Sequence, residues 1–303
     1  MVTTPKDYAV PESIPHPTSH PARPRVIVVS GGTDGMGRAL ALARLERGDT
    51  VIALGSNPAK GQRLLADAGK IGATDRIDLI RVDLSSVART RAAIRDIAAR
   101  HERIDALTLF ANRQAPKRTV TREGLEQTFA LYYLSRYLLS HGLSPQLGRS
   151  QSRVIVNVAG VGMTKGQIHW DNLQLEHGYG MVTAQLQAGR ANDLLGLAFA
   201  AQPHNPIRYV LYHPGFTKSG DLSPLPAAMR ASIRAAACLS ARPIAESIAS
   251  IHEFIDTPPA APLTAIDRDK PVPLTIETLD PANAERLSEA TRTLLAYIEH
   301  EPG

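Results

Sequence analysis

The stretch that decides the fold reads Val26-Ile27-Val28-Val29-Ser30-Gly31-Gly32-Thr33-Asp34-Gly35-Met36-Gly37-Arg38. Its β-branched run is typical of a buried strand, and residues 39–45 follow as an amphipathic helix. Glycine has no Cβ, so the backbone between strand and helix can approach a pyrophosphate, whose charge binds the free N–H groups that start the helix. A glycine triplet alone also occurs in ordinary tight turns, but with a strand before it and a helix after it we predict a dinucleotide site.

The composition of the 303-residue chain limits the class of protein. Hydrophobic residues make up 43% of it, which suffices for one large α/β domain. Cys238 is the one cysteine, so we expect no disulfide framework and no cysteine-based metal site. His169 and Asp171 suggest a metal pair, but no third ligand accompanies them, so we expect no metal. The net charge is +5, but the basic residues are scattered, which does not favour a nucleic-acid partner.

Membrane and export signals are also missing from the sequence. No apolar run approaches the ~20 residues of a membrane span, and the first residues lack the continuous apolar segment of a secretory signal. We therefore expect no membrane partner and a cytoplasmic location.

The order of elements predicts the domain organisation. Residues 1–24 are rich in proline and read as a flexible arm, with an arm that wraps a partner subunit as the alternative. Residues 25–303 read as a single domain. Predicted strands lie at 25–30, 50–54, 77–82 and 104–110, and predicted helices at 35–47, 59–69 and 86–101. This alternation indicates a Rossmann-type, doubly wound parallel sheet, which binds ligands beyond the carboxyl ends of its strands.

The loop after the second strand bears on the choice between NAD and NADP. Binders of NAD usually carry an acid here for the ribose hydroxyls, and this loop has none. Ser56, Asn57 and Lys60 instead offer hydroxyl, amide and ammonium donors for a 2′-phosphate. The pattern favours NADP(H) over NAD(H), with ordinary loop residues as the alternative.

Several separated motifs resemble the short-chain dehydrogenase/reductase (SDR) superfamily. One is the Gly-x-x-x-Gly-x-Gly spacing that follows Ser30. Residues 123–139, 153–158 and 168–174, together with Tyr212-His213-Pro214-Gly215-Phe216-Thr217, are similar to its retinol-dehydrogenase branch. The resemblance extends from about residue 25 to 220 and implies the Rossmann-type fold with helices on both faces of the sheet.

The resemblance also implies which residues line the cofactor. In SDR proteins an Asp after the third strand meets the adenine amino group, although Asp83 or Ser85 also suits a helix N-cap. Arg113 and Gln114 stand where the family has small residues, so this wall should be crowded and cationic. The implied cofactor contacts are Ser30, Gly31, Thr33, Asp34, Gly35, Met36, Gly37, Ser56, Asn57, Lys60, Asp83, Leu84, Asn112, Pro214, Gly215, Phe216 and Thr217.

Relatives also suggest the outer parts of the domain. They often form a homo-oligomer through long helices, which correspond here to 121–144 and 178–201. They keep a substrate-covering segment that corresponds to 221–240, and helices are predicted after it at 243–256 and 281–299.

The four catalytic side chains of SDR reductases are absent where the motifs place them. Those enzymes use a Tyr as general acid, a Lys four residues later that lowers its pKa, a Ser that holds the carbonyl, and an Asn that anchors a relay water. Gln185, Gly189, Gly160 and Tyr132 stand at these positions. An amide has no acidic proton at neutral pH, so the standard reduction should lose the general-acid contribution of roughly 10²–10⁴.

Three side chains are candidates to take over the chemistry. Tyr132 brings a phenol into the vacated site from the opposite helix, or it packs there as a core residue. Arg113 can polarise a carbonyl or steady an anion, or it forms a salt bridge. Gln185 itself is the third candidate. Gly160 and Gly189 remove bulk, which opens the floor of the pocket for a larger ligand.

Three functions are compatible with these residues. The first is an NADP(H)-dependent oxidoreductase acting on a small-molecule carbonyl, imine or iminium, or activated alkene; an iminium is already charged and needs no general acid. The second is a non-redox cyclase or isomerase on the same scaffold. The third is a binding protein that senses NADP(H) without catalysis. The retained glycine turn, Asp83 and Pro-Gly loop favour cofactor binding, and we rank the oxidoreductase first.

Overall fold

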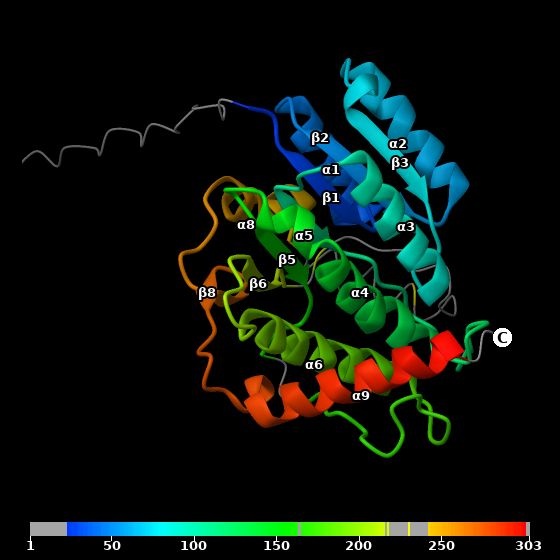
Figure 1. Cartoon of the computed structure of the whole chain (residues 1–303). Helices are drawn as coiled ribbons and strands as arrows, with labels where there is room; N and C mark the ends of the chain where they lie inside the picture. The colour runs from blue at the N-terminus through cyan, green and yellow to red at the C-terminus, as the bar shows by residue number, and fades with distance from the viewer. Residues whose placement is uncertain (1–22, 163–164, 216, 218–229, 231–241, 301–303) are drawn as a thin grey trace, which may run out of the picture.

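An eight-stranded sheet forms the centre of the computed structural model, which describes residues 23–162, 165–215, 217, 230 and 242–300 (Figure 1). The strands are β1 (Val26–Ser30), β2 (Thr50–Gly55), β3 (Ile77–Arg81), β4 (Ala106–Leu109), β5 (Val154–Val158), β6 (Arg208–His213), β7 (Leu263–Asp267) and β8 (Lys270–Pro271). Their spatial order is β3-β2-β1-β4-β5-β6-β7-β8, and only the β7–β8 pair is antiparallel. This order confirms the doubly wound fold and reverses between β1 and β4, where such sheets bind ligands.

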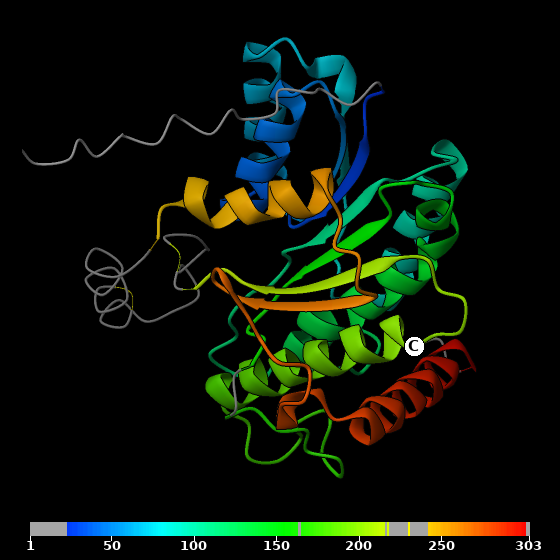
Figure 2. The ribbon, with the colours of Figure 1, turned by 90° about the vertical axis from the view of Figure 1, so that its left-hand side faces the viewer.

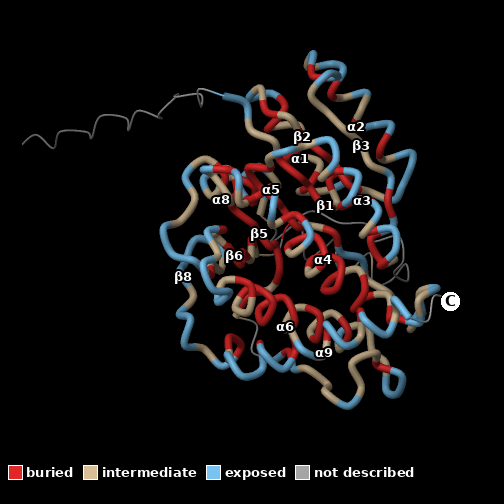
Figure 3. Tube along the Cα trace, in the orientation of Figure 1, coloured by how far each residue is buried: buried red, intermediate tan, exposed pale blue. Residues whose placement is uncertain are grey.

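The central strands are apolar on both faces because helices cover both sides of the sheet. In β1, Ile27 and Val29 pack into one layer and Val28 into the other, and all three are fully buried. Figure 3 shows the same burial along the neighbouring strands. The sequence run that decides the fold is therefore the core strand of the sheet.

Two helical layers enclose the sheet (Figure 2). One contains α1 (Gly35–Glu46), α2 (Pro58–Lys70) and α8 (Ile244–Asp256). The other contains α3 (Val87–Arg100), the π-helix η2 (Phe129–Leu134), α4 (Ser135–Gly142), α6 (Met181–Ala200) and α9 (Pro281–His300). Short elements connect them, namely η1 (Thr74–Arg76), α5 (Ser144–Gly148) and η3 (Glu277–Leu279). Between α8 and α9 the chain forms the edge strands β7 and β8.

The prediction of a single helix over 121–144 is wrong at both ends. Val120 and Glu126 form an antiparallel bridge instead, and Gly124 adopts a positive φ of 79°. The carboxylate of Glu126 accepts the backbone N–H groups of Thr128 (2.8 Å) and Phe129 (2.7 Å), so helical structure begins only after it. At the other end, α4 stops at Gly142 and a separate short α5 follows.

The helix α9 of the same chain covers the helices through which relatives are expected to pair. It packs along α6, and the Tyr133 and Thr291 hydroxyls share a hydrogen bond of 2.7 Å. Leu287 of α9 is 1% exposed and lies in the same core as Leu194 and Leu195 of α6. In this chain, α9 therefore covers part of the surface of residues 121–144 and 178–201, through which subunit contacts were expected.

Some predicted features lie outside the described residues. These are most of the 1–24 arm, Phe216, and the 221–240 segment except Arg230. The helix predicted at 243–256 is confirmed as α8. Within the described part of the chain, no helix combines the length and apolar character that a membrane crossing requires.

Candidate active site

The glycine turn joins β1 to α1 at the switch point of the sheet. A Cβ on Gly31 would lie 2.9 Å from the Ala111 nitrogen, and one on Gly37 would lie 2.4 Å from the Gly31 oxygen. Gly31 also has a positive φ of 73°. Neither position admits a side chain, so the turn presents backbone close to the β4 edge.

The start of α1 completes this anion site. Asp34 is its N-cap, and its Oδ1 accepts the N–H of Gly35 at 2.9 Å. At the end of β1, the hydroxyl of Ser30 is buried without a hydrogen-bond partner among the described residues. A cradle of bare backbone and an unpartnered hydroxyl fit a nicotinamide dinucleotide, whose pyrophosphate would lie against residues 31–37.

The rim beyond β2 holds the residues predicted to bind a 2′-phosphate. Asn57 caps α2 by accepting the N–H of Lys60 at 3.0 Å, so its oxygen is engaged. Lys60 Nζ forms an ion pair of 2.6 Å with Asp34 Oδ2. Ser56 is exposed, whereas Thr33 is buried against Gly55. The structure thus places the Lys60 ammonium next to the glycine turn, where it is paired with the carboxylate of Asp34.

The residues after β3 form a turn that serves α3. Asp83 Oδ1 accepts the backbone N–H and the hydroxyl of Ser85 at 3.0 and 2.7 Å. The N-cap of α3 is Ser86. Leu84 is buried in the core, while Asp83 is exposed. Asp83 therefore keeps a structural role and still faces solvent at the ligand edge.

A pair of amides joins the loop after β4 to the first turns of α6. Asn112 Nδ2 donates to Gln185 Oε1 at 2.9 Å, and Gln185 Nε2 donates to Asn112 Oδ1 at 3.2 Å. Gln185 Nε2 also reaches the carbonyl of Arg113 at 3.1 Å. Asn112 and Arg113 are exposed, and Gln185 is half-buried. The structure brings all three predicted residues together, with the amide of Gln185 engaged on the protein itself.

The loop after β6 lies at the same edge of the sheet. His213 Nδ1 lies 2.8 Å from Asp267 Oδ1 at the end of β7. Gly215 has a positive φ of 81°, and a Cβ there would meet Arg268 at 3.1 Å. Thr217 is buried, and its hydroxyl lies 3.2 Å from that of Ser247. Pro214, Gly215 and Thr217 are thus held where a nicotinamide is expected.

Tyr132 occupies the floor between η2, β5 and α6. It is 8% exposed, and its carbonyl accepts the side-chain N–H of Asn192 at 2.8 Å. Burial raises the pKa of the phenol and Asp193 raises it further, while Arg136 and a backbone contact with Gly160 act in the opposite direction. The phenol is therefore protonated at neutral pH and lies against Gly160.

Comparisons with known proteins agree with this arrangement. A model of the short chain dehydrogenase family matches residues 25–172. Human dehydrogenase/reductase SDR family member 12 is 27% identical over 210 residues, covering 69% of this chain and 66% of that protein. Human retinol dehydrogenase 11 is 26% identical over 196 residues, covering 64% and 62%. The chain belongs to the short-chain dehydrogenase/reductase superfamily. Its curated relatives place it beside the retinol dehydrogenases.

Solved structures show the same fold. A short chain dehydrogenase from Salmonella enterica has a TM-score of 0.61 at 20% identity, covering 84% of this chain and all of that one. One from Shigella flexneri, complexed with NADP, has a TM-score of 0.60 at 18% identity, covering 81% and 97%. The matched regions span from half to just over two thirds of the length of the curated relatives.

Of the four residues that the resemblance aligns with the SDR tetrad, Tyr132 and Gly160 are in contact. Gln185 and Gly189 lie on α6, Gly160 follows β5, and Tyr132 contacts the backbone of Gly160. A Cβ on Gly189 would meet nothing within 4 Å. The position predicted for the family's lysine is therefore not filled by another described side chain.

Arg136 is the residue that the sequence analysis missed. It is fully buried on α4, and its guanidinium lies 4.6 Å from the centroid of the Tyr132 ring. It donates to Val158 O at 2.9 Å, to Ala111 O at 3.2 Å and to Asn157 Oδ1. A basic residue four positions after Tyr132, inside an apolar helix, was the available signal.

Asp193 is a second buried group near this floor. It is 1% exposed on α6, and burial raises its pKa to about 7, against the opposing influence of Arg190, Gly162 and Thr278. Its Oδ1 has no hydrogen-bond partner among the described residues.

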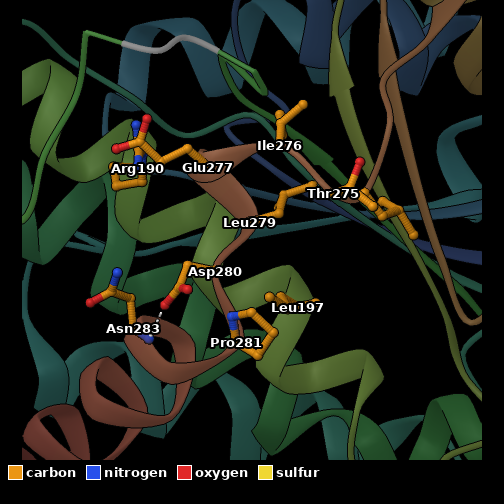
Figure 4. Close-up of a pocket in the computed structure, with 10 residues that line it drawn as sticks. Arg190, Leu197, Thr275, Ile276, Glu277, Leu279, Asp280, Pro281 and Asn283 are labelled. Carbon is orange, nitrogen blue, oxygen red and sulfur yellow. Dashed lines mark hydrogen bonds between the residues drawn. The ribbon is translucent and has the colours of Figure 1, made fainter.

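A groove of about 440 Å³ lies along another face of α6, between Arg190, Leu197 and the chain from Leu274 to Asn283 (Figure 4). Its lining contains none of the predicted site residues. In the described part of the chain, no group of three His, Cys, Asp or Glu side chains is placed to hold a metal ion.

Proposed function

We propose that this SDR chain is an NADP(H)-dependent oxidoreductase with a non-standard proton source. Its substrates are small molecules with a carbonyl, an imine or iminium, or an activated alkene. The observation that carries the proposal is the pairing of a bare glycine cradle at β1 with a protonated phenol, Tyr132, which stands at the family's asparagine position and lies against Gly160.

The proposed cofactor contacts follow the carboxyl edge of the sheet. Residues 31–37 would hold the pyrophosphate, Asp83 and Leu84 the adenine, and Asn112 and 214–217 the nicotinamide half. The bound cofactor supplies the hydride. NADP(H) is preferred because no acid follows β2 and because Ser56 and Lys60 stand at the rim; related folds complexed with NADP and NADPH support it.

On the substrate side, the chain supplies a proton and a charged rim. Tyr132 keeps its proton because it is buried, and it would donate to the substrate atom that gains negative charge during hydride transfer. Arg113 would steady an anionic substrate at the mouth. Gln185 would touch the substrate while its amide holds Asn112 in place. The empty space beside Gly189 favours a bulky acceptor.

A non-redox cyclase or isomerase is the second candidate. The observation that favours it is the replacement, in the sequence, of the side chains at all four positions aligned with the SDR tetrad. An NADP(H)-sensing protein would share the cofactor contacts without turnover.

The first test is a fluorescence titration with NADPH and NADH. We expect NADPH to bind more tightly in the parent protein. Gly37→Ala should abolish binding, because its Cβ would lie 2.4 Å from the Gly31 oxygen. Gly189→Ala is the matched control, since a Cβ there meets nothing. Equal affinity for both nucleotides would refute the NADP preference, and no binding of either would refute the function.

A turnover assay then separates the candidates. Oxidation of NADPH in the presence of a panel of carbonyl and iminium compounds would support the oxidoreductase. Tight binding without oxidation by any of them would leave the isomerase and sensor hypotheses.

A further inference from the structure

We propose that Arg136 is the positioning residue that prepares Tyr132 to donate its proton, in place of the lysine that SDR reductases carry on α6. This inference rests on the proposed function and adds to it the group that stabilises the phenolate. Tyr132 and Arg136 form a Tyr-x-x-x-Arg pair on one helix, across the pocket from the position where the family has Tyr-x-x-x-Lys.

The first argument is how firmly Arg136 is held. Its guanidinium is fully buried and donates to three oxygens at the ends of β4 and β5, which belong to Ala111, Asn157 and Val158. The amide of Asn157 donates in turn to Asn192 at 3.0 Å, and Asn192 donates to the carbonyl of Tyr132 at 2.8 Å. One network of amides thus fixes both members of the pair, which a mobile surface cation would not allow.

The second argument is the charge of the site. Among the described residues no carboxylate forms an ion pair with Arg136, and the three oxygens that accept its hydrogen bonds are neutral. Burial lowers the pKa of Arg136 to about 10, so it remains a cation at neutral pH. A buried charge without a counter-ion is costly, and a new anion beside it is stabilised.

Proton donation creates that anion. During reduction of a carbonyl, a bound nicotinamide would be oxidised by giving up a hydride with its two electrons. The carbonyl carbon would accept that hydride, and the carbonyl oxygen would take up a proton. The Tyr132 O–H bond breaks to supply that proton, which leaves a phenolate beside the Arg136 guanidinium. Water re-protonates the phenolate afterwards. The lone cation becomes an ion pair in the transition state, which is where stabilisation accelerates a reaction.

The other groups around the phenol set the balance that Arg136 must shift. Burial and Asp193 of α6 both disfavour the phenolate, and the backbone of Gly160 favours it. Tyr209 of β6 lies near the guanidinium and is itself held neutral, because burial raises its pKa to about 12. Arg136 is the one cation that acts on Tyr132 in this set.

A thiol titration tests this effect without any substrate. Cys238 is the chain's one cysteine, so Tyr132→Cys in a Cys238→Ser background carries a single thiol whose ionisation is followed by absorbance near 240 nm. We expect the thiol pKa at 132 to rise by at least about one unit when Arg136→Gln is added. Tyr133→Cys in the same background is the matched control. It is buried next to 132 but, in the described structure, has no guanidinium over its ring. The thiol at position 133 should have a higher pKa than the thiol at position 132. This comparison does not use Arg136→Gln, so it remains a test even if that variant does not fold. Equal thiol pKa values at 132 and 133 would overturn the inference.

A kinetic cycle tests the consequence. With NADPH and the aromatic diketone 9,10-phenanthrenequinone as acceptor, Arg136→Gln should lower kcat by roughly 10–100-fold, within the range of a general-acid contribution. In a Tyr132→Phe background it should lower kcat less than twofold, because its target is gone. Arg136→Lys, which keeps the charge, should recover most of the rate. Equal losses in both backgrounds would overturn the inference. A thiol effect without any turnover would refute the proposed function alone.

Discussion

At the scale of single residues, the site brings together two oppositely charged side chains that are far apart in the sequence. Lys60 was expected to meet a phosphate, yet it lies 2.6 Å from Asp34 at the start of α1. A helix N-terminus attracts anions, so Asp34 occupies a position that the cofactor's phosphates also favour. The ion pair therefore tempers the NADP preference that the loop composition alone suggests.

Asp34→Asn should separate these effects. Asn retains the N-cap oxygen but removes the charge, so Lys60 loses its ion pair with this residue and NADPH should bind roughly 3–10-fold more tightly, with a smaller change for NADH. Fluorescence titration of both nucleotides measures the ratio. If NADPH and NADH tighten equally, Lys60 does not contact the 2′-phosphate. Ser56→Asp is the complementary variant and should shift the preference toward NADH.

Asp193 makes a pH-dependent prediction. Its pKa is raised by burial to about 7, so the folded state holds a proton that the unfolded chain releases near pH 4. Below pH 4 this carboxyl is protonated in both states and does not change the free energy of unfolding. As the pH rises from 4 to 7, it lowers the free energy of unfolding progressively. Asp193→Asn should therefore raise the free energy of unfolding at pH 8 by roughly 1 to 4 kcal/mol and leave it nearly unchanged at pH 4. Urea unfolding at both pH values measures this; equal effects would show that the carboxylate is compensated.

At the scale of elements, the start of η2 is set by a side chain rather than by propensity. Glu126 is 1% exposed and its carboxylate accepts two backbone N–H groups of the first turn, while its own N–H donates to Gln174 at 2.7 Å. The residues before it form a turn and a bridge instead of helix. Tyr132 and Arg136 depend on this start point for their direction.

Glu126→Ala should therefore cost about 1–3 kcal/mol of stability, because two buried N–H groups lose their acceptor. Glu126→Gln retains one acceptor oxygen and should cost less. Urea unfolding measures both, and NADPH affinity serves as the functional control because residues 31–37 are remote in the chain. A neutral Glu126→Ala would mean that water replaces the carboxylate.

At the scale of the whole molecule, α9 decides which faces remain exposed. It returns from the far edge of the sheet and covers α6 and the end of η2, and Arg91 of α3 pairs with Glu299 near its end. The apolar surface that relatives are expected to share between subunits is therefore internal here.

We predict that the chain sediments as a monomer and that Leu287→Asp makes it self-associate. The new carboxylate would be buried without a partner, so α9 should detach and expose the apolar faces of η2 and α6. Thr293→Asp, on the exposed side of α9, is the control and should remain monomeric. Sedimentation velocity measures both. A dimeric parent protein would show that another face mediates assembly.

The sequence by itself determined the α/β class, the order of β1 to β4 along the chain and the glycine turn, and it predicts the loss of the SDR tetrad. These features depend on local patterns, namely buried β-branched runs, helical periodicity and glycines between them. The tertiary structure decided the partners of the polar groups. The Lys60–Asp34 pair, the Asn112–Gln185 amides and the buried contacts of Arg136 join residues from different elements, and their burial and distances exist only once the helices are packed on the sheet. The chemistry of a site depends on these distances and on the low dielectric of its buried surroundings. The order of residues in the sequence contains neither.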